Sequence, residues 1–177
     1  MRSAHRKHRA FTLVEMLAVI FVIAILVTIV VGVSNMVIRR SRIEQTRVTM
    51  SVIMTALDKY NEVKHGYPPE ATDFSDKPTS GWSDPDWQAC CRGAKVYADL
   101  LAVPECQARL TSLDKNCIKT FNGKTTFKLT FTDGFEKYMD YRQPGGNGGA
   151  GGMPLLESAG PDGDFTATAD NIRSDNR

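Results

Sequence analysis

The longest apolar run in the chain extends from Met16 to Val33 and contains no charged residue. At about 1.5 Å per residue, a helix over this run would span roughly 27 Å, close to the hydrocarbon thickness of a bilayer. The pattern therefore predicts a membrane-spanning helix.

The hydrophobic pattern changes after this run but stays helical. From Val48 to Val63, apolar residues recur at steps of three and four, and polar residues occupy the opposite face. No proline occurs from Phe11 to Val63, and Gly32 is the only glycine there. The sequence predicts one continuous helix over these residues, ended by the Gly66-Tyr67-Pro68-Pro69 segment.

The middle of the chain carries weaker signals. Residues 66–93 contain several prolines and many Asp and Ser residues, so we expect an irregular surface segment there, anchored by Trp82 and Trp87. A helical pattern follows from Ala94 to Val103 and stops at Pro104.

Two runs of alternating hydrophobicity indicate strands, one over residues 125–131 and one over 135–141. Thr132-Asp133-Gly134 lies between them, which predicts a hairpin whose Phe127, Leu129 and Phe131 cover the long helix. A glycine-rich stretch at 145–152 leads to a short strand at 154–158. The predicted fold class is α+β, a long amino-terminal helix packed against a small antiparallel β-meander.

Charge and motifs exclude several functions. The chain has 22 basic and 20 acidic residues, and four of the basic ones lie in the first ten positions, where there is no acid. The rest of the chain is not basic, so we expect no nucleic-acid binding. No G-x-S-x-G, P-loop or H-E-x-x-H motif occurs, and His65 is the only histidine after residue 10. We therefore expect no enzyme activity.

The four cysteines all follow the apolar run, at Cys90, Cys91, Cys106 and Cys117. If this part of the chain enters an oxidising compartment, disulfides are expected. A bond between adjacent cysteines strains the intervening peptide, so we expect Cys90 and Cys91 each to reach one of the other two. A zinc site is the alternative, although C-x-x-C pairs and a nearby histidine are lacking.

The carboxyl-terminal segment 158–172 is rich in oxygen-bearing side chains. They recur at every second position, as Asp162, Asp164, Thr166, Thr168 and Asp170. Calcium takes six to eight oxygen ligands, so this spacing suits a calcium loop, although it is not an EF-hand. A solvated acidic turn is the alternative.

The segment Ala10-Phe11-Thr12-Leu13-Val14-Glu15, after a basic stretch and before the apolar run, resembles the processing site of type IV prepilins and type II secretion pseudopilins. The resemblance implies that a prepilin peptidase cuts between Ala10 and Phe11 and methylates Phe11. It implies that Glu15 neutralises the new amine of a neighbouring subunit during assembly. Ala10 stands where the family usually has Gly. The alternatives are a removable secretory signal and a plain membrane anchor with an incidental Glu15.

The carboxyl-terminal pattern S-x-G-x-D-G…D-N-I is similar to the calcium-binding loop of type II secretion major pseudopilins. This resemblance implies calcium as a cofactor, with Asp162, Asp170 and Asn171 as ligands. Asp164 and Ser158 are further candidates.

Together these resemblances imply a pilin-like structural subunit of a type II secretion pseudopilus. The expected parts are a leader at 1–10, a membrane-spanning and filament-core segment at 11–33, an amphipathic half-helix at 34–65 and a periplasmic head at 66–177. The expected partners are further copies in a helical filament, prepilin peptidase, an inner-membrane assembly platform and minor pseudopilins. A type IV pilus subunit serving adhesion, motility or DNA uptake is the alternative.

Overall fold

The computed structural model describes residues 12–75, 77, 81, 83–120, 129–144, 152–167 and 169–175 of the 177-residue chain. Its contacts divide the chain into two compact units, Met1–Ile38 and Arg39–Arg177. The α+β class is confirmed, because one long helix precedes two small antiparallel sheets.

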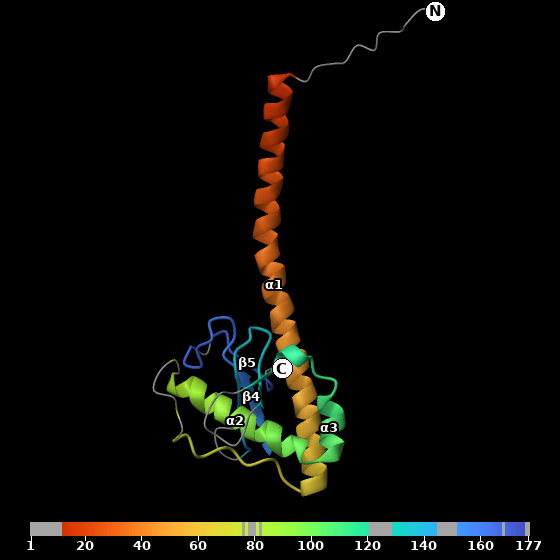
Figure 1. Ribbon diagram of the computed structural model, residues 1–177, viewed down its shortest axis with the longest axis vertical. Helices are drawn as coiled ribbons and strands as arrows, with labels where there is room; N and C mark the ends of the chain where they lie inside the picture. The colour runs from red at the N-terminus through yellow and green to blue at the C-terminus, as the bar shows by residue number, and fades with distance from the viewer. Residues whose placement is uncertain are drawn as a thin grey trace, which may run out of the picture. The chain divides into compact units, whose positions relative to one another are not determined.

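Helix α1 (Leu13–Lys64) confirms the continuous amino-terminal helix (Figure 1). Among the described residues it is the one helix long and apolar enough to cross a membrane, with a mean hydropathy of 3.2 over its most apolar stretch. The side chains of that stretch are exposed. The helix ends at Lys64, and His65 takes the left-handed conformation with a φ of 56°. The left-handed residue thus lies one position before Gly66.

The second unit contains the remaining elements. They are α2 (Asp84–Leu101), α3 (Pro104–Leu110), the 3-10 helix η1 (Lys115–Cys117), β1 (Ile118–Thr120), β2 (Leu129–Phe131), β3 (Met139–Arg142), β4 (Leu155–Ser158) and β5 (Ile172–Arg173). Strands β1 and β2 form one antiparallel sheet, and β3, β4 and β5 form a second in that order. The short strand predicted at 154–158 is confirmed as β4.

Helix α2 corrects the prediction that residues 66–93 are irregular, because it begins at Asp84. Ser83 caps it by accepting a hydrogen bond of 3.2 Å from the Asp86 backbone N–H. Pro85 lies in the first turn, where its missing N–H costs nothing, and Asp84 and Asp86 complement the helix dipole. Of the two tryptophans expected to anchor this region, Trp87 is buried on α2, and Trp82 lies outside the described residues.

The predicted hairpin is only partly present. Strand β2 pairs with β1 and β3 pairs with β4, so the two predicted partners lie in different sheets, joined by one bridge between Thr132 and Tyr138. The turn between them is fastened to α1 instead. The Gly134 N–H donates to Thr46 Oγ1 at 3.0 Å, and a Cβ on Gly134 would collide with the Arg42 carbonyl. Residues 125–128 lie outside the described part of the chain.

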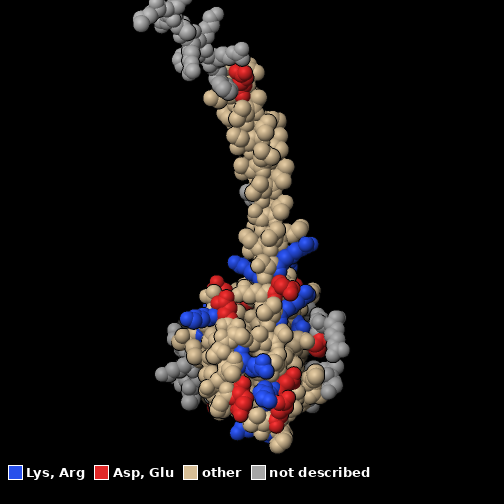
Figure 2. Space-filling model, turned by 90° about the vertical axis from the view of Figure 1, so that its right-hand side faces the viewer, with Lys and Arg blue, Asp and Glu red and all other residues tan. Residues whose placement is uncertain are grey.

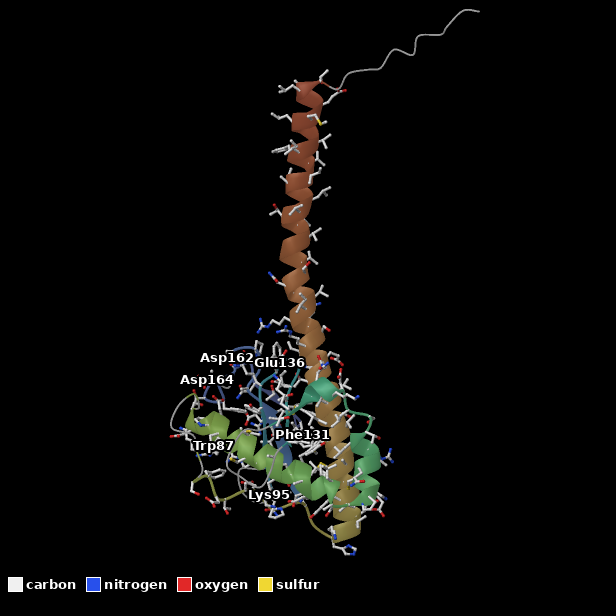
Figure 3. The ribbon with its side chains drawn as sticks, viewed as in Figure 1. Trp87, Lys95, Phe131, Glu136, Asp162 and Asp164 are labelled. Carbon is white, nitrogen blue, oxygen red and sulfur yellow. The ribbon has the colours of Figure 1, made fainter. Side chains whose placement is uncertain are left out.

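The core of the second unit lies where the amphipathic half of α1 and helix α2 meet the strands. Phe131 is fully buried (Figure 3). Its ring lies edge-on to that of Tyr97, with 5.1 Å between the two ring centroids. The same cluster holds the buried residues Ile53, Leu57, Val96, Leu100 and Tyr141. Leu129 packs against this cluster as predicted, whereas Phe127 lies outside the described residues.

An ion pair joins α2 to β3. The Arg92 guanidinium donates to the Asp140 carboxylate, with 2.9 Å between Nη2 and Oδ2, and Asp140 is almost fully buried. Arg142 Nε also donates to Asp140 Oδ2 at 3.1 Å, so two guanidinium groups share this buried carboxylate. Removing Asp140 would leave the Arg92 guanidinium, which is mostly buried, without its ion-pair partner between α2 and the second sheet.

Candidate processing site and calcium loop

The amino-terminal end of α1 is capped by a reciprocal pair of hydrogen bonds between Thr12 and Glu15. Thr12 Oγ1 accepts from the Glu15 N–H at 3.2 Å, and Glu15 Oε2 accepts from the Thr12 N–H at 2.9 Å. The Thr12 hydroxyl also donates to Glu15 Oε2 at 2.9 Å. This is a capping box, which satisfies backbone donors that the first turn leaves free. The spacing T-x-x-E from Thr12 to Glu15 is the local sequence signal for this box.

The predicted cleavage site is adjacent to this cap. Ala10 and Phe11 lie outside the described residues, and Thr12 follows them directly. A cut between Ala10 and Phe11 would therefore place a new amine one residue before the cap. Glu15 would then be the carboxylate in the first turn of the helix that begins there.

Four of the predicted calcium residues, Asp162, Asp164, Asp170 and Asn171, lie on the loop between β4 and β5, whereas Ser158 ends β4. Two successive Asx turns form part of this loop. Asp162 Oδ1 accepts from the Asp164 N–H at 2.9 Å, and Asp164 Oδ1 accepts from the Thr166 N–H at 2.8 Å (Figure 3). The Thr166 hydroxyl also donates to Asp164 Oδ1 at 2.7 Å. These Thr166 hydrogen bonds lower the pKa of Asp164. The Asp164 carboxylate is thus engaged within the loop, and Thr168 lies outside the described residues.

The two ends of this loop meet at Gly160 and Asp170. Gly160 has a φ of +69°, and a Cβ there would collide with the Asp170 carbonyl and lie 3.4 Å from Asp170 Cγ. Only glycine fits this position without strain. The contact brings the Asp170 carboxyl group back to the turn that carries Asp162.

Asn171 supplies an unsatisfied buried oxygen beside this closure. Its Nδ2 donates to Glu157 Oε1 at 3.1 Å, whereas its Oδ1 is buried and has no hydrogen-bond partner. A buried polar atom without a partner is costly, and an amide oxygen is a calcium ligand. A calcium ion would satisfy this oxygen, and the carboxylates of Asp162 and Asp170 are the further ligands that the sequence predicts. Within the described ranges, no group of three or more Asp, Glu, His or Cys residues is placed so that it could hold a metal ion.

Ser158 has a different task in the structure. Its Oγ donates to Asp133 Oδ2 at 2.5 Å and accepts from the Gly160 N–H at 3.1 Å. The hydroxyl therefore links the loop to the turn after β2. Burial raises the pKa of Asp133, and this effect exceeds that of its hydrogen bonds, which act in the opposite direction.

The amino-terminal segment is also where the chain matches a known family. The family model of the prokaryotic N-terminal methylation motif matches residues 5–31. The chain carries this methylation signal. The matched range includes the expected cleavage site, Glu15 and most of the apolar run, and it supports a type IV pilin-like or pseudopilin subunit. It implies processing by prepilin peptidase and assembly of a membrane-associated filament. Comparison with curated proteins finds no match, and neither does comparison with solved structures.

The four cysteines do not form the disulfides that the sequence predicts. All four are buried and none forms a disulfide in the structure, so the predicted bonds from Cys90 and Cys91 to Cys106 and Cys117 are not present there. Each thiol has other surroundings. Cys106 donates to the Ala56 carbonyl at 3.4 Å, and Cys117 lies 3.2 Å from the Thr49 hydroxyl. Cys90 and Cys91 belong to a separate cluster with Trp87, and burial raises the pKa of Cys90.

Proposed function

We propose that the chain is a structural subunit of a type II secretion pseudopilus, anchored in the bacterial inner membrane with its head in the periplasm. The observation that carries the proposal is the methylation motif over residues 5–31. The second half of this motif lies in α1, which is long and apolar enough to span a bilayer. The carboxyl-terminal loop favours the pseudopilus over the type IV pilus, because it resembles the calcium loop of major pseudopilins.

In this proposal, the prepilin peptidase removes residues 1–10 and methylates the amine of Phe11. Subunits then leave the bilayer and pack their apolar half-helices into a filament core, with the assembly platform and minor pseudopilins as partners. The Phe11 amine and the Glu15 carboxylate of a neighbouring subunit are costly in that core when apart and tolerable when paired. Glu15 would therefore set the register between subunits.

Calcium would act on the head. When bound, the ion would neutralise the carboxylates of Asp162 and Asp170 and provide a partner for Asn171 Oδ1. Support for this role comes from the unpartnered buried oxygen and from the close approach of Gly160 to Asp170. Two contacts would position these ligands. Gly160 lets the backbone approach Asp170 closely, and Glu157 accepts a hydrogen bond from Asn171 Nδ2.

The first test is the intact mass and amino-terminal sequence of the protein from cells with and without prepilin peptidase. We expect a chain that begins at N-methylated Phe11 only when the peptidase is present. An uncut chain in both strains would refute the filament subunit. Deleting the gene should stop export of secreted proteins and leave surface pili intact, whereas loss of pili with normal export would favour the type IV pilus.

A further inference from the structure

Charge returns to α1 abruptly at the boundary between the two units. No charged residue lies between Met16 and Ile38, and then Arg39, Arg40 and Arg42 follow within four positions. All three are exposed on α1, and Figure 2 shows Lys and Arg side chains gathering where the uncharged surface of the helix ends. We call these residues the arginine collar.

Within the part of the chain that the structure describes, none of the three collar arginines forms an ion pair. The nearby carboxylates have other partners. Glu44 Oε2 lies 3.8 Å from Arg47 Nη1, and Glu136 Oε2 lies 2.8 Å from Lys119 Nζ. The pKa of Glu136 is lowered chiefly by Lys119, and Arg42 adds only a smaller effect.

The position of the collar along α1 matches the edge of a bilayer. The uncharged stretch from Met16 to Ile38 covers about 34 Å as a helix, slightly more than the roughly 30 Å of hydrocarbon. The arginines therefore leave the apolar layer at the level of the lipid headgroups. At about 100° per residue, they spread over an arc of roughly 160° around the helix, enough to face more than one lipid.

We propose that the arginine collar binds the phosphates of anionic phospholipids at the outer end of the membrane-spanning segment. The planar guanidinium fork pairs bidentately with phosphate, and basic residues beside a membrane helix attract anionic lipid. The collar would hold the subunit at a fixed depth before assembly, and these contacts would be released when the subunit leaves the bilayer. The proposal rests on the anchoring of α1 in the membrane, and not on which filament the subunit builds.

The test measures lipid affinity of the full chain in mild detergent, with phosphatidylglycerol or phosphatidylcholine titrated at low salt. We expect the wild type to prefer phosphatidylglycerol. Arg39→Gln/Arg40→Gln/Arg42→Gln should weaken phosphatidylglycerol binding on the order of a hundredfold and remove the preference. The matched control is Lys64→Gln/Arg109→Gln/Lys115→Gln, which removes the same charge at exposed sites on α1, α3 and η1 and should keep the preference.

Alkaline extraction of membranes tests the anchoring of α1 in the membrane separately from lipid binding by the arginine collar. A wild-type chain that is washed off would refute membrane anchoring itself. A chain that stays embedded but binds both lipids equally, or a collar variant that keeps the preference, would overturn the collar proposal alone. Inorganic phosphate at the lipid concentration should not compete, and competition would point to a free phosphate site instead.

Discussion

The backbone N–H of Thr12 donates to the carboxylate of Glu15 at 2.9 Å, so Glu15, the acidic residue in the first turn of α1, also caps that helix. The carboxylate that is proposed to meet a neighbour's amine already has a partner within its own chain. Two roles, capping and charge pairing, therefore fall on Glu15 and can be separated by substitution.

Glu15→Gln keeps an oxygen that can accept from Thr12 but removes the charge, whereas Glu15→Ala removes both. We expect both variants to insert into the membrane and both to lower filament yield roughly tenfold or more, because the amine of Phe11 loses its counterion. Filament yield is measured in sheared fractions, and insertion by alkaline extraction. Normal yield from Glu15→Gln with failure of Glu15→Ala would assign Glu15 to capping alone.

The turn at Gly134 should tolerate no side chain. Gly134→Ala places a Cβ against the Arg42 carbonyl, a backbone atom that cannot move aside without shifting α1. We expect a loss of about 2 kcal/mol or more in the free energy of unfolding, measured by denaturant titration. Gly66→Ala is the control, because a Cβ there meets nothing within 4 Å, and it should change stability by about 0.5 kcal/mol or less. Equal effects would contradict the fastening of the turn to α1.

Asp133 should make the head less stable as pH rises. Burial raises its pKa above the usual aspartate value of 3.8, so the folded state binds more protons than the unfolded state between that value and the folded pKa. The stabilising contribution of the protonated form is complete below pH 3.8 and is lost as pH rises through the folded pKa. Asp133→Asn cannot ionise, so its stability relative to wild type should increase with pH across this window. A flat difference in unfolding free energy from pH 3 to 8 would contradict this.

Calcium should raise the melting temperature of the purified full chain, and a chelator should reverse the shift. At 100 times its dissociation constant, a ligand of the native state adds about 2.7 kcal/mol. Asp170→Ala and Asn171→Ala should abolish the shift, because they remove proposed ligand atoms. Asp164→Asn should keep most of it, because the Asp164 carboxylate is engaged by Thr166. An unchanged melting temperature with chelator would remove calcium from the proposal.

The cysteines should titrate as thiols. We expect a thiol reagent to find four reactive groups per chain in denaturant without reductant, and almost none in the native protein, because all four are buried and none forms a disulfide. Cys106→Ser should leave three. Fewer than four in the wild type would show that disulfides form, and peptide mapping would then give their pairing.

The sequence alone determined the features that depend on neighbours along the chain. The continuous helix follows from its three-and-four periodicity and the lack of proline before Gly66, and the methylation motif is a contiguous pattern. The start of α2 is equally local, since Ser83 is its N-cap and Pro85 fits its first turn, although a proline in such a segment also predicts a loop.

Only the tertiary structure decided where the strands pair and which site atoms lack partners. Alternation around Asp133-Gly134 predicts a hairpin, but its two strands lie in different sheets. The turn between them instead contacts Arg42 and also Thr46, 88 positions away. The same holds for Ser158, which Asp133 engages, and for the unpartnered oxygen of Asn171. Periodicity reports which face of an element is apolar, whereas the partner of that face depends on chain segments that local sequence does not encode.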